Sequence, residues 1–152
     1  MYFDRLFPMG VAAMVEAADL VLAGKHRETV QDESLASYEG WCREAEARVS
    51  WASHVDFVYD LIRGCNPAPG AWTTLQGTRL QIFDSRKHPV RTYGAVKGKI
   101  GEVSEVGPQS FSVTAQGGRI EILKAKFGDG KKLSAPEVAA AAGIKAGTLL
   151  GT

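Results

Sequence analysis

Residues 61–73 read Leu61-Ile62-Arg63-Gly64-Cys65-Asn66-Pro67-Ala68-Pro69-Gly70-Ala71-Trp72-Thr73 and separate two parts of the chain with different hydrophobic patterns. Pro67 and Pro69 lack a backbone N–H and force the preceding residues into an extended conformation, so a helix cannot continue through them. Apolar residues recur at helical spacing before this point and alternate with polar residues after it. We call residues 65–70 the junction. The sequence therefore predicts helices before the junction and strands after it, an α+β, mainly β fold.

Two helices are predicted upstream of the junction. The first covers Phe7 to Ala23, with Pro8 in its first turn and Gly24 as its stop signal. A polar connector from Lys25 to Tyr38 follows. The second helix is expected to end near Arg63 and to be capped by Ser50 or Ser53. Its apolar stripe consists of Val55, Val58, Leu61 and Ile62.

Five short strands and one more helix are predicted downstream. The strands are residues 71–75, residues 78–85, residues 98–106, a run around Phe111 and Val113, and a run around Ile120 and Ile122. A small closed or partly closed antiparallel barrel is the economical way to remove the edges of five strands, and an OB-like barrel fits best. Ser134-Ala135-Pro136-Glu137 has capping-box spacing and predicts a C-terminal helix reaching Gly143. We thus expect a helical segment with a proline-rich linker over residues 1–70 and a barrel domain over residues 71–152.

Composition and charge limit the functional class. The chain has 152 residues, 45% hydrophobic and 23% charged, which fits one soluble domain or two small packed subdomains. Met9 to Leu22 is the longest apolar stretch and is too short for a bilayer, so no membrane partner is expected. Cys42 and Cys65 form no CxxC pair, which indicates reduced thiols and a cytoplasmic protein.

The two halves of the chain carry opposite charge. Residues 1–78 contain 6 Lys and Arg against 11 Asp and Glu, a balance of −5. Residues 79–152 contain 12 against 6, a balance of +6. This asymmetry fits an anionic partner for the basic half, and it fits equally two halves that attract each other.

The residues offer no recognisable active site. His26, His54 and His88 are scattered, without the short spacing that brings two imidazoles to one metal, so no metal site is expected. The sequence contains no nucleophile elbow and no phosphate-binding glycine loop. Asp56 and Asp60 lie four residues apart and could form a paired-carboxylate site, although such a pair is more often a solvated helix face.

The junction nevertheless resembles a known sequence. It is similar to the segment before the C-terminal domain of the formyl-tetrahydrofolate-dependent formyltransferase family, which includes methionyl-tRNA formyltransferase, formyltetrahydrofolate dehydrogenase and amino-sugar formyltransferases. Further matches are Gln31-Asp32-Glu33-Ser34 with Ala36-Ser37-Tyr38, then Trp51, then the hairpin at Gly117-Gly118, and Gly-Lys-Lys at 130–132. The first helix resembles the closing helix of the family's catalytic domain, so the resemblance covers nearly the whole chain.

This resemblance implies that the chain is one part of an enzyme. Family members catalyse in an N-terminal Rossmann-like domain with an Asn, a His and an Asp. Here the only asparagine is Asn66 in the junction, and no histidine lies in the family's H-x-S-x-L-P context. No catalytic residue is therefore carried over, and no formyl transfer is expected from this chain alone. Formyl-tetrahydrofolate is implied for the parent enzyme and not for this chain, and the catalytic domain is the implied partner.

The resemblance also suggests site residues. Arg63, Pro69, Gly70 and Trp72 are candidates for substrate binding, although Arg63 as a helix cap and Trp72 as a core anchor are the plainer interpretations. If the acceptor is tRNA, rather than an amino-sugar nucleotide, phosphate contacts are expected from the basic half. Phe83 could stack a base, or pack beneath residues 86–94. The nucleic-acid candidates are Arg79, Phe83, Arg86, Lys87, Arg91, Lys97 and Lys99.

Two alternatives remain open at this stage. One is a non-catalytic OB-like module that binds oligonucleotides. The other is a structural module that dimerises or stabilises its parent through the broad apolar face of the first helix, which predicts self-association.

Overall fold

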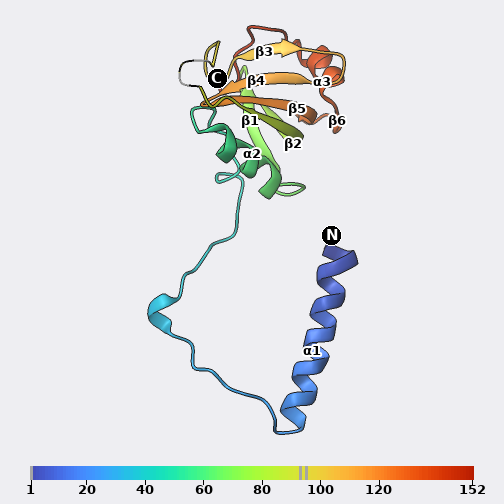
Figure 1. The fold of residues 1–152 in the computed structure, drawn as a ribbon. Helices are drawn as coiled ribbons and strands as arrows, with labels where there is room; N and C mark the ends of the chain where they lie inside the picture. The colour runs from blue at the N-terminus through green and yellow to red at the C-terminus, as the bar shows by residue number, and fades with distance from the viewer. Residues whose placement is uncertain (1, 93, 95) are drawn as a thin grey trace. The chain divides into compact units, whose positions relative to one another are not determined.

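The computed structural model describes residues 2–92, 94 and 96–152, which divide into two compact units. The first ends at Glu39 and the second comprises Gly40–Thr152 (Figure 1). In the first unit a π-helical turn, η1 (Tyr2–Leu6), leads into α1 (Phe7–Leu22), and a 3-10 turn, η2 (Glu33–Leu35), lies within the polar connector. The predicted first helix is confirmed, with Pro8 in its first turn and its large apolar side chains exposed.

The second helix, α2 (Val55–Gly64), begins later than the predicted serine caps allow. Its N-cap is His54, whose Nδ1 accepts a hydrogen bond from the Asp56 backbone N–H at 3.3 Å. The Val55 N–H donates to the Gln116 carbonyl at 2.7 Å, so the helix start is fixed by the hairpin turn at Gln116. The prediction of Ser50 or Ser53 as the cap is wrong because this long-range bond decides where the helix begins.

Six strands form one antiparallel sheet in the order β1-β2-β5-β4-β3, with β6 paired to β5. The strands are β1 (Ala71–Leu75), β2 (Thr78–Pro89), β3 (Val103–Val106), β4 (Phe111–Ala115), β5 (Gly118–Phe127) and β6 (Leu133–Ser134). The sequence predicts five strands and misses β6, which has only two residues. It also starts the third strand too early, at Gly98.

The C-terminal tail closes the sheet. The Leu150 N–H donates to the Gly101 carbonyl at 2.9 Å, next to β3, and the Gly151 N–H donates to the Thr74 carbonyl on β1 at 2.8 Å. A Cβ on Gly101 would lie 2.8 Å from the Leu150 carbonyl oxygen, so glycine is needed for this close approach. The tail thereby pairs with both edges of the sheet, and the predicted partly closed antiparallel arrangement is present.

The core lies between the sheet and the helices α2 and α3 (Ala135–Ala142), which pack on β2 and on β5 respectively (Figure 1). The predicted capping box is confirmed at Ser134 and Glu137. The largest fully buried side chains include Ile62, Leu80, Ile82, Phe111, Ile120 and Ile122. The α+β class, with two helices before the sheet and a short helix after it, is therefore confirmed. The domain boundary after residue 70 and the OB-like relationship stay predictions.

In the described part of the chain, no helix combines the length and the apolar character needed to cross a bilayer.

Candidate functional site

The junction is held tightly against β2. The Gly70 N–H donates to the Cys65 carbonyl at 2.8 Å, and Gln81 Nε2 donates to the Pro69 carbonyl at 3.3 Å. Gly70 has φ +82°, and a Cβ there would lie 3.1 Å from Gln81 Nε2. Gly70 is buried, so the structure gives this candidate residue a packing role between the junction and β2.

Trp72 and Arg79 connect β1 and β2 to the segment that precedes α2. Trp72 Nε1 donates to the Glu44 carbonyl at 2.7 Å, and the Arg79 guanidinium lies 4.9 Å from the centroid of the Trp72 ring. Arg79 Nη1 also pairs with Glu44 Oε1 at 3.0 Å. Both side chains are therefore engaged by the protein itself, as expected of an anchor that holds one segment on another.

Arg63 and Phe83 lie around the C-terminal end of α2. Arg63 Nη1 is 3.7 Å from Asp60 Oδ1, and its guanidinium lies 5.4 Å from the Tyr59 ring centroid. Phe83 lies on β2 at the point where the pairing with β5 shifts register, between Ile82 and Asp84. The ammonium of Lys132 lies 4.2 Å from the centroid of the Phe83 ring.

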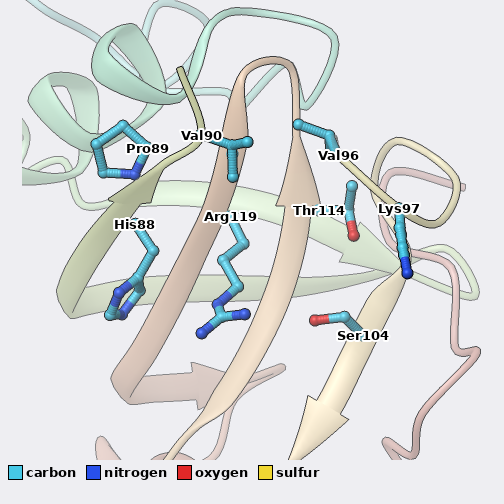
Figure 2. Close-up of a pocket in the computed structure, with 9 residues that line it drawn as sticks. His88, Pro89, Val90, Val96, Lys97, Ser104, Thr114 and Arg119 are labelled. Atoms are coloured by element: carbon cyan, nitrogen blue, oxygen red, sulfur yellow. The ribbon is translucent and has the colours of Figure 1, made fainter. Parts of the chain in front are cut away.

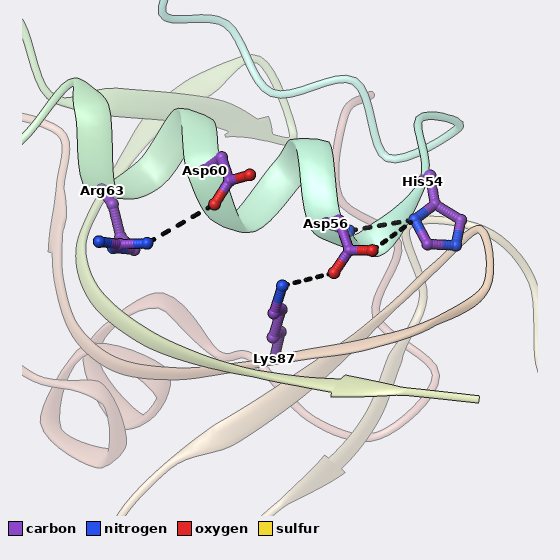
Figure 3. A network of polar contacts seen from close by, with 5 residues as sticks. All are labelled: His54, Asp56, Asp60, Arg63 and Lys87. Atoms are coloured by element: carbon purple, nitrogen blue, oxygen red, sulfur yellow. Dashed lines mark hydrogen bonds and ion pairs between the residues drawn. The ribbon is translucent and has the colours of Figure 1, made fainter. Parts of the chain in front are cut away.

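A polar network connects the start of α2 to β2 (Figure 3). Lys87 Nζ donates to Asp56 Oδ1 at 2.5 Å, and His54 Nδ1 lies 3.3 Å from Asp56 Oδ2. The bond from Lys87 lowers the pKa of Asp56, and the same bond raises the pKa of Lys87. Asp60 pairs separately with Arg63, so the two carboxylates do not form a shared acid–base site.

Two cavities open beside the end of β2, on a surface that we call the β2-end furrow. The first has a volume of about 390 Å³ and the second about 470 Å³, and Pro89 and Val90 line both. The first is shown in Figure 2 and is lined by His88, Pro89, Val90, Val96, Lys97, Ser104, Thr114, Gly118 and Arg119. The second is lined by His54, Asp56, Lys87, Pro89, Val90, Arg91 and Gly117.

Strand register brings the furrow's polar groups together. On β5, Arg119 is the register partner of His88 on β2 and of Thr114 on β4. Lys97 reaches the same cavity from the segment before β3, and Arg91 lines the neighbouring cavity. Within residues 2–92, 94 and 96–152, none of Arg91, Lys97 and Arg119 takes part in an ion pair.

The carboxylates near the furrow already have hydrogen-bond or ion-pair partners within the protein. Glu121 Oε2 binds His88 Nε2 at 2.8 Å, and Ser110 donates to Glu121 Oε1 at 2.9 Å. The bond from His88 lowers the pKa of Glu121. Asp56, the acidic group lining the second cavity, pairs with Lys87. The furrow therefore presents unpaired cationic side chains, which suits an anion such as a phosphate.

Only three of the seven sequence-predicted nucleic-acid candidates line the furrow. Arg91 and Lys97 line the furrow as unpaired cations, and Lys87 lines it as a paired one. Arg79 and Phe83 lie toward the other end of β2, while Arg86 is opposite Glu121. Lys99 is exposed, and its backbone N–H donates to Glu102.

Four polar residues that line the first cavity were not among the candidates named from the sequence: His88, Ser104, Thr114 and Arg119. The turn at Gly117-Gly118 contained a usable signal for one pair, because a tight hairpin after Gln116 places Arg119 opposite Thr114.

No group of three His, Cys, Asp or Glu side chains suited to a metal ion occurs among the residues that the structure describes.

Comparisons with known proteins identify the family to which the chain is similar. The family model described as "Formyl transferase, C-terminal domain" matches residues 42–143. The methionyl-tRNA formyltransferase of Moorella thermoacetica is 35% identical over 130 residues, which covers 86% of this chain and 40% of that protein. The methionyl-tRNA formyltransferase of Geotalea uraniireducens is 32% identical over 148 residues, covering 97% of this chain and 45% of that protein.

Two further similar proteins carry other names. The human mitochondrial 10-formyltetrahydrofolate dehydrogenase is 32% identical over 145 residues, covering 90% of this chain and 15% of that protein. The crystal structure of HypX from Aquifex aeolicus in complex with tetrahydrofolic acid superposes with a TM-score of 0.65 at 20% identity. It covers 87% of this chain and 23% of that chain, and it supports the fold alone.

Proposed function

Because the chain belongs to the formyl transferase C-terminal domain family, we propose that it is the acceptor-positioning part of a formyl-tetrahydrofolate-dependent formyltransferase. The chain spans less than half the length of the methionyl-tRNA formyltransferases it matches, 40% and 45%. The part of those relatives that this chain does not cover is long enough for an N-terminal Rossmann-like catalytic domain. That domain would hold formyl-tetrahydrofolate and perform the transfer in the cytoplasm.

The role of this domain would be positional. Formyl transfer forms a bond between the acceptor nitrogen and the formyl carbon, and breaks the bond from that carbon to the folate nitrogen. Holding the acceptor so that its amine meets the formyl carbon removes much of the entropic barrier to this step. The junction supports such a role, since the bonds of Pro69 and Gly70 fix how the sheet follows α2.

We propose tRNA as the acceptor. The single observation that carries this proposal is the unpaired cationic set Arg91, Lys97 and Arg119 along the β2-end furrow. A polyanion bridges such separated cations, whereas Lys87 and Arg79 are already neutralised by protein carboxylates. The names of the first relatives agree with a tRNA acceptor.

The test compares charge-matched variants. Arg91→Gln/Lys97→Gln/Arg119→Gln should raise the Kd for aminoacylated tRNA by roughly tenfold at low salt. The control, Lys124→Gln/Lys131→Gln/Lys145→Gln, removes the same charge at exposed positions outside the furrow and should change the Kd little. Equal effects of the two triples would indicate non-specific attraction by net charge. No tRNA binding by either protein, together with binding of an amino-sugar nucleotide, would replace tRNA by a small acceptor.

A further inference from the structure

The two cysteines lie next to each other in the folded chain. Cys42 Sγ and Cys65 Sγ are 3.6 Å apart although the residues are separated by 23 positions in sequence. Cys42 is exposed and Cys65 is only 2% exposed. Both are free thiols. A disulfide needs its sulfurs at about 2.05 Å, so an approach of about 1.5 Å would close the bond.

The fold fixes the position of both thiols. Cys65 is the C-cap of α2, where its N–H donates to Leu61 and its carbonyl accepts from Gly70. On the other side, the segment that follows Cys42 is held on β1 by Trp72. The Trp72 indole donates to the Glu44 carbonyl at 2.7 Å, and the backbone N–H of Trp72 donates to the Ala47 carbonyl at 3.0 Å.

We propose that Cys42 and Cys65 form a site of reversible oxidation, which closes to an intramolecular disulfide when the protein meets a low-molecular-weight disulfide such as oxidised glutathione. This inference does not rest on the proposed function, because both residues lie outside the β2-end furrow.

The reaction proceeds in two exchanges. The exposed Cys42 thiolate attacks one sulfur of oxidised glutathione, which forms a mixed disulfide and releases one glutathione thiolate. The Cys65 thiolate then attacks Cys42 Sγ, forms the Cys42–Cys65 bond and releases the second glutathione. The protein dithiol loses two electrons, the glutathione disulfide gains them, and the two thiol protons end on the two released glutathiones.

Accessibility and acidity set the order of these exchanges. Burial raises the pKa of the Cys65 thiol to about 11, and its contact with Cys42 acts in the same direction. Since the thiolate is the attacking species, Cys65 reacts second. Below that pKa the thiolate fraction of Cys65 rises about tenfold per pH unit, so closure should be faster at pH 9 than at pH 7.

The experiment treats the full 152-residue chain with oxidised glutathione, traps remaining thiols by alkylation and follows the products by mass spectrometry. We expect a transient glutathione adduct on Cys42, then a product without glutathione in which tryptic peptides 28–43 and 64–79 are cross-linked. Dithiothreitol should restore two alkylatable thiols. The oxidised chain should also unfold at a midpoint roughly 5–10 °C higher, because the closed loop restricts the unfolded chain.

Matched variants identify each step. Cys65→Ala should stop at the Cys42 adduct, and Cys42→Ser should leave Cys65 unmodified in the folded protein. Cys42 is exposed, so Cys42→Ser provides a folded control even if the buried substitution destabilises the chain. A wild-type protein that retains a stable glutathione adduct, forms mainly intermolecular disulfides, or keeps both thiols reactive toward the alkylating agent would overturn the proposal.

Discussion

Arg119 lies directly opposite His88 across the β2–β5 ladder, and both side chains line the same cavity of about 390 Å³ (Figure 2). The antiparallel register of β2 against β5, in which Pro89 is opposite Gly118, places these two residues opposite each other. His88 is held by Glu121, whereas Arg119 takes part in no ion pair within the described ranges. Arg119 therefore presents a cation to this cavity.

Paired and unpaired lysines in the furrow should differ in their effect on RNA binding. Lys97→Gln removes an unpaired cation, so the plot of log K against log salt should become shallower by about one. Lys87→Gln removes a charge that Asp56 already neutralises, so the Kd should change by less than roughly twofold. Fluorescence anisotropy with labelled tRNA measures both. Equal losses for the two variants would contradict the distinction.

Replacing Gly117 with a residue that carries a side chain should destabilise the fold. Gly117 has φ +75°, and a Cβ there would lie 2.5 Å from His54 Nε2. Gly117→Ala should therefore lower the free energy of unfolding by about 1–2 kcal/mol for the backbone conformation, and by more for displacing the His54 ring. Gly77→Ala is the matched control, because Gly77 has φ +77° but no neighbour within 4 Å. Urea denaturation of both variants checks this, and a Gly117→Ala variant no less stable than the control would count against it.

Glu121 should contribute stability that depends on pH. The bond from His88 lowers its pKa from the ordinary value of 4.5. A carboxyl group with a lowered pKa in the folded state stabilises the fold above about pH 4.5, and the contribution is lost as the pH falls through the folded-state value. Glu121→Gln should therefore unfold at lower urea than wild type at pH 7, and the difference should shrink below pH 4.5. Glu39→Gln, in the first unit, is the control; a difference for Glu121→Gln that is independent of pH would disprove the linkage.

The exposed apolar surface of α1 should cause self-association when no other domain covers it. Met14 is 72% exposed and Leu22 is 86% exposed. Light scattering over a concentration series should show a rising mean mass, and Met14→Glu/Leu22→Glu should reduce it. Leu35→Glu changes an equally exposed leucine outside the helix and should have no such effect. A chain that stays monomeric at high concentration would refute this expectation.

Local sequence patterns predicted most helices and strands of the fold. They did not predict the features that depend on hydrogen bonds between residues far apart in the sequence. Pro67 and Pro69 correctly mark the change from helix to strand, and the spacing of Ser134 and Glu137 correctly marks α3. The N-cap of α2 was missed because the Gln116 carbonyl, 61 positions away, fixes the N–H of Val55.

The same distinction between local and long-range features applies to the candidate site. Arg91 and Lys97 could be named because a basic side chain is visible in the sequence. Arg119 could be placed beside His88 only through the β2–β5 register, which contains shifts at Ile82/Asp84 and Asp84/Ser85 that no alternation pattern reveals. The proximity of Cys42 and Cys65 likewise depends on Trp72 holding the segment after Cys42, a contact between distant residues.

The most direct test of the central claim, that the β2-end furrow binds acceptor RNA through phosphate contacts, is the affinity of this chain for aminoacylated initiator tRNA over a salt series. An unrelated RNA of equal length serves as the comparison. With three unpaired cations, the account predicts a Kd on the order of micromolar at low salt and a slope of log K against log salt of about −3 for both RNAs. Absence of binding at low salt, or binding that does not weaken with salt, would contradict it.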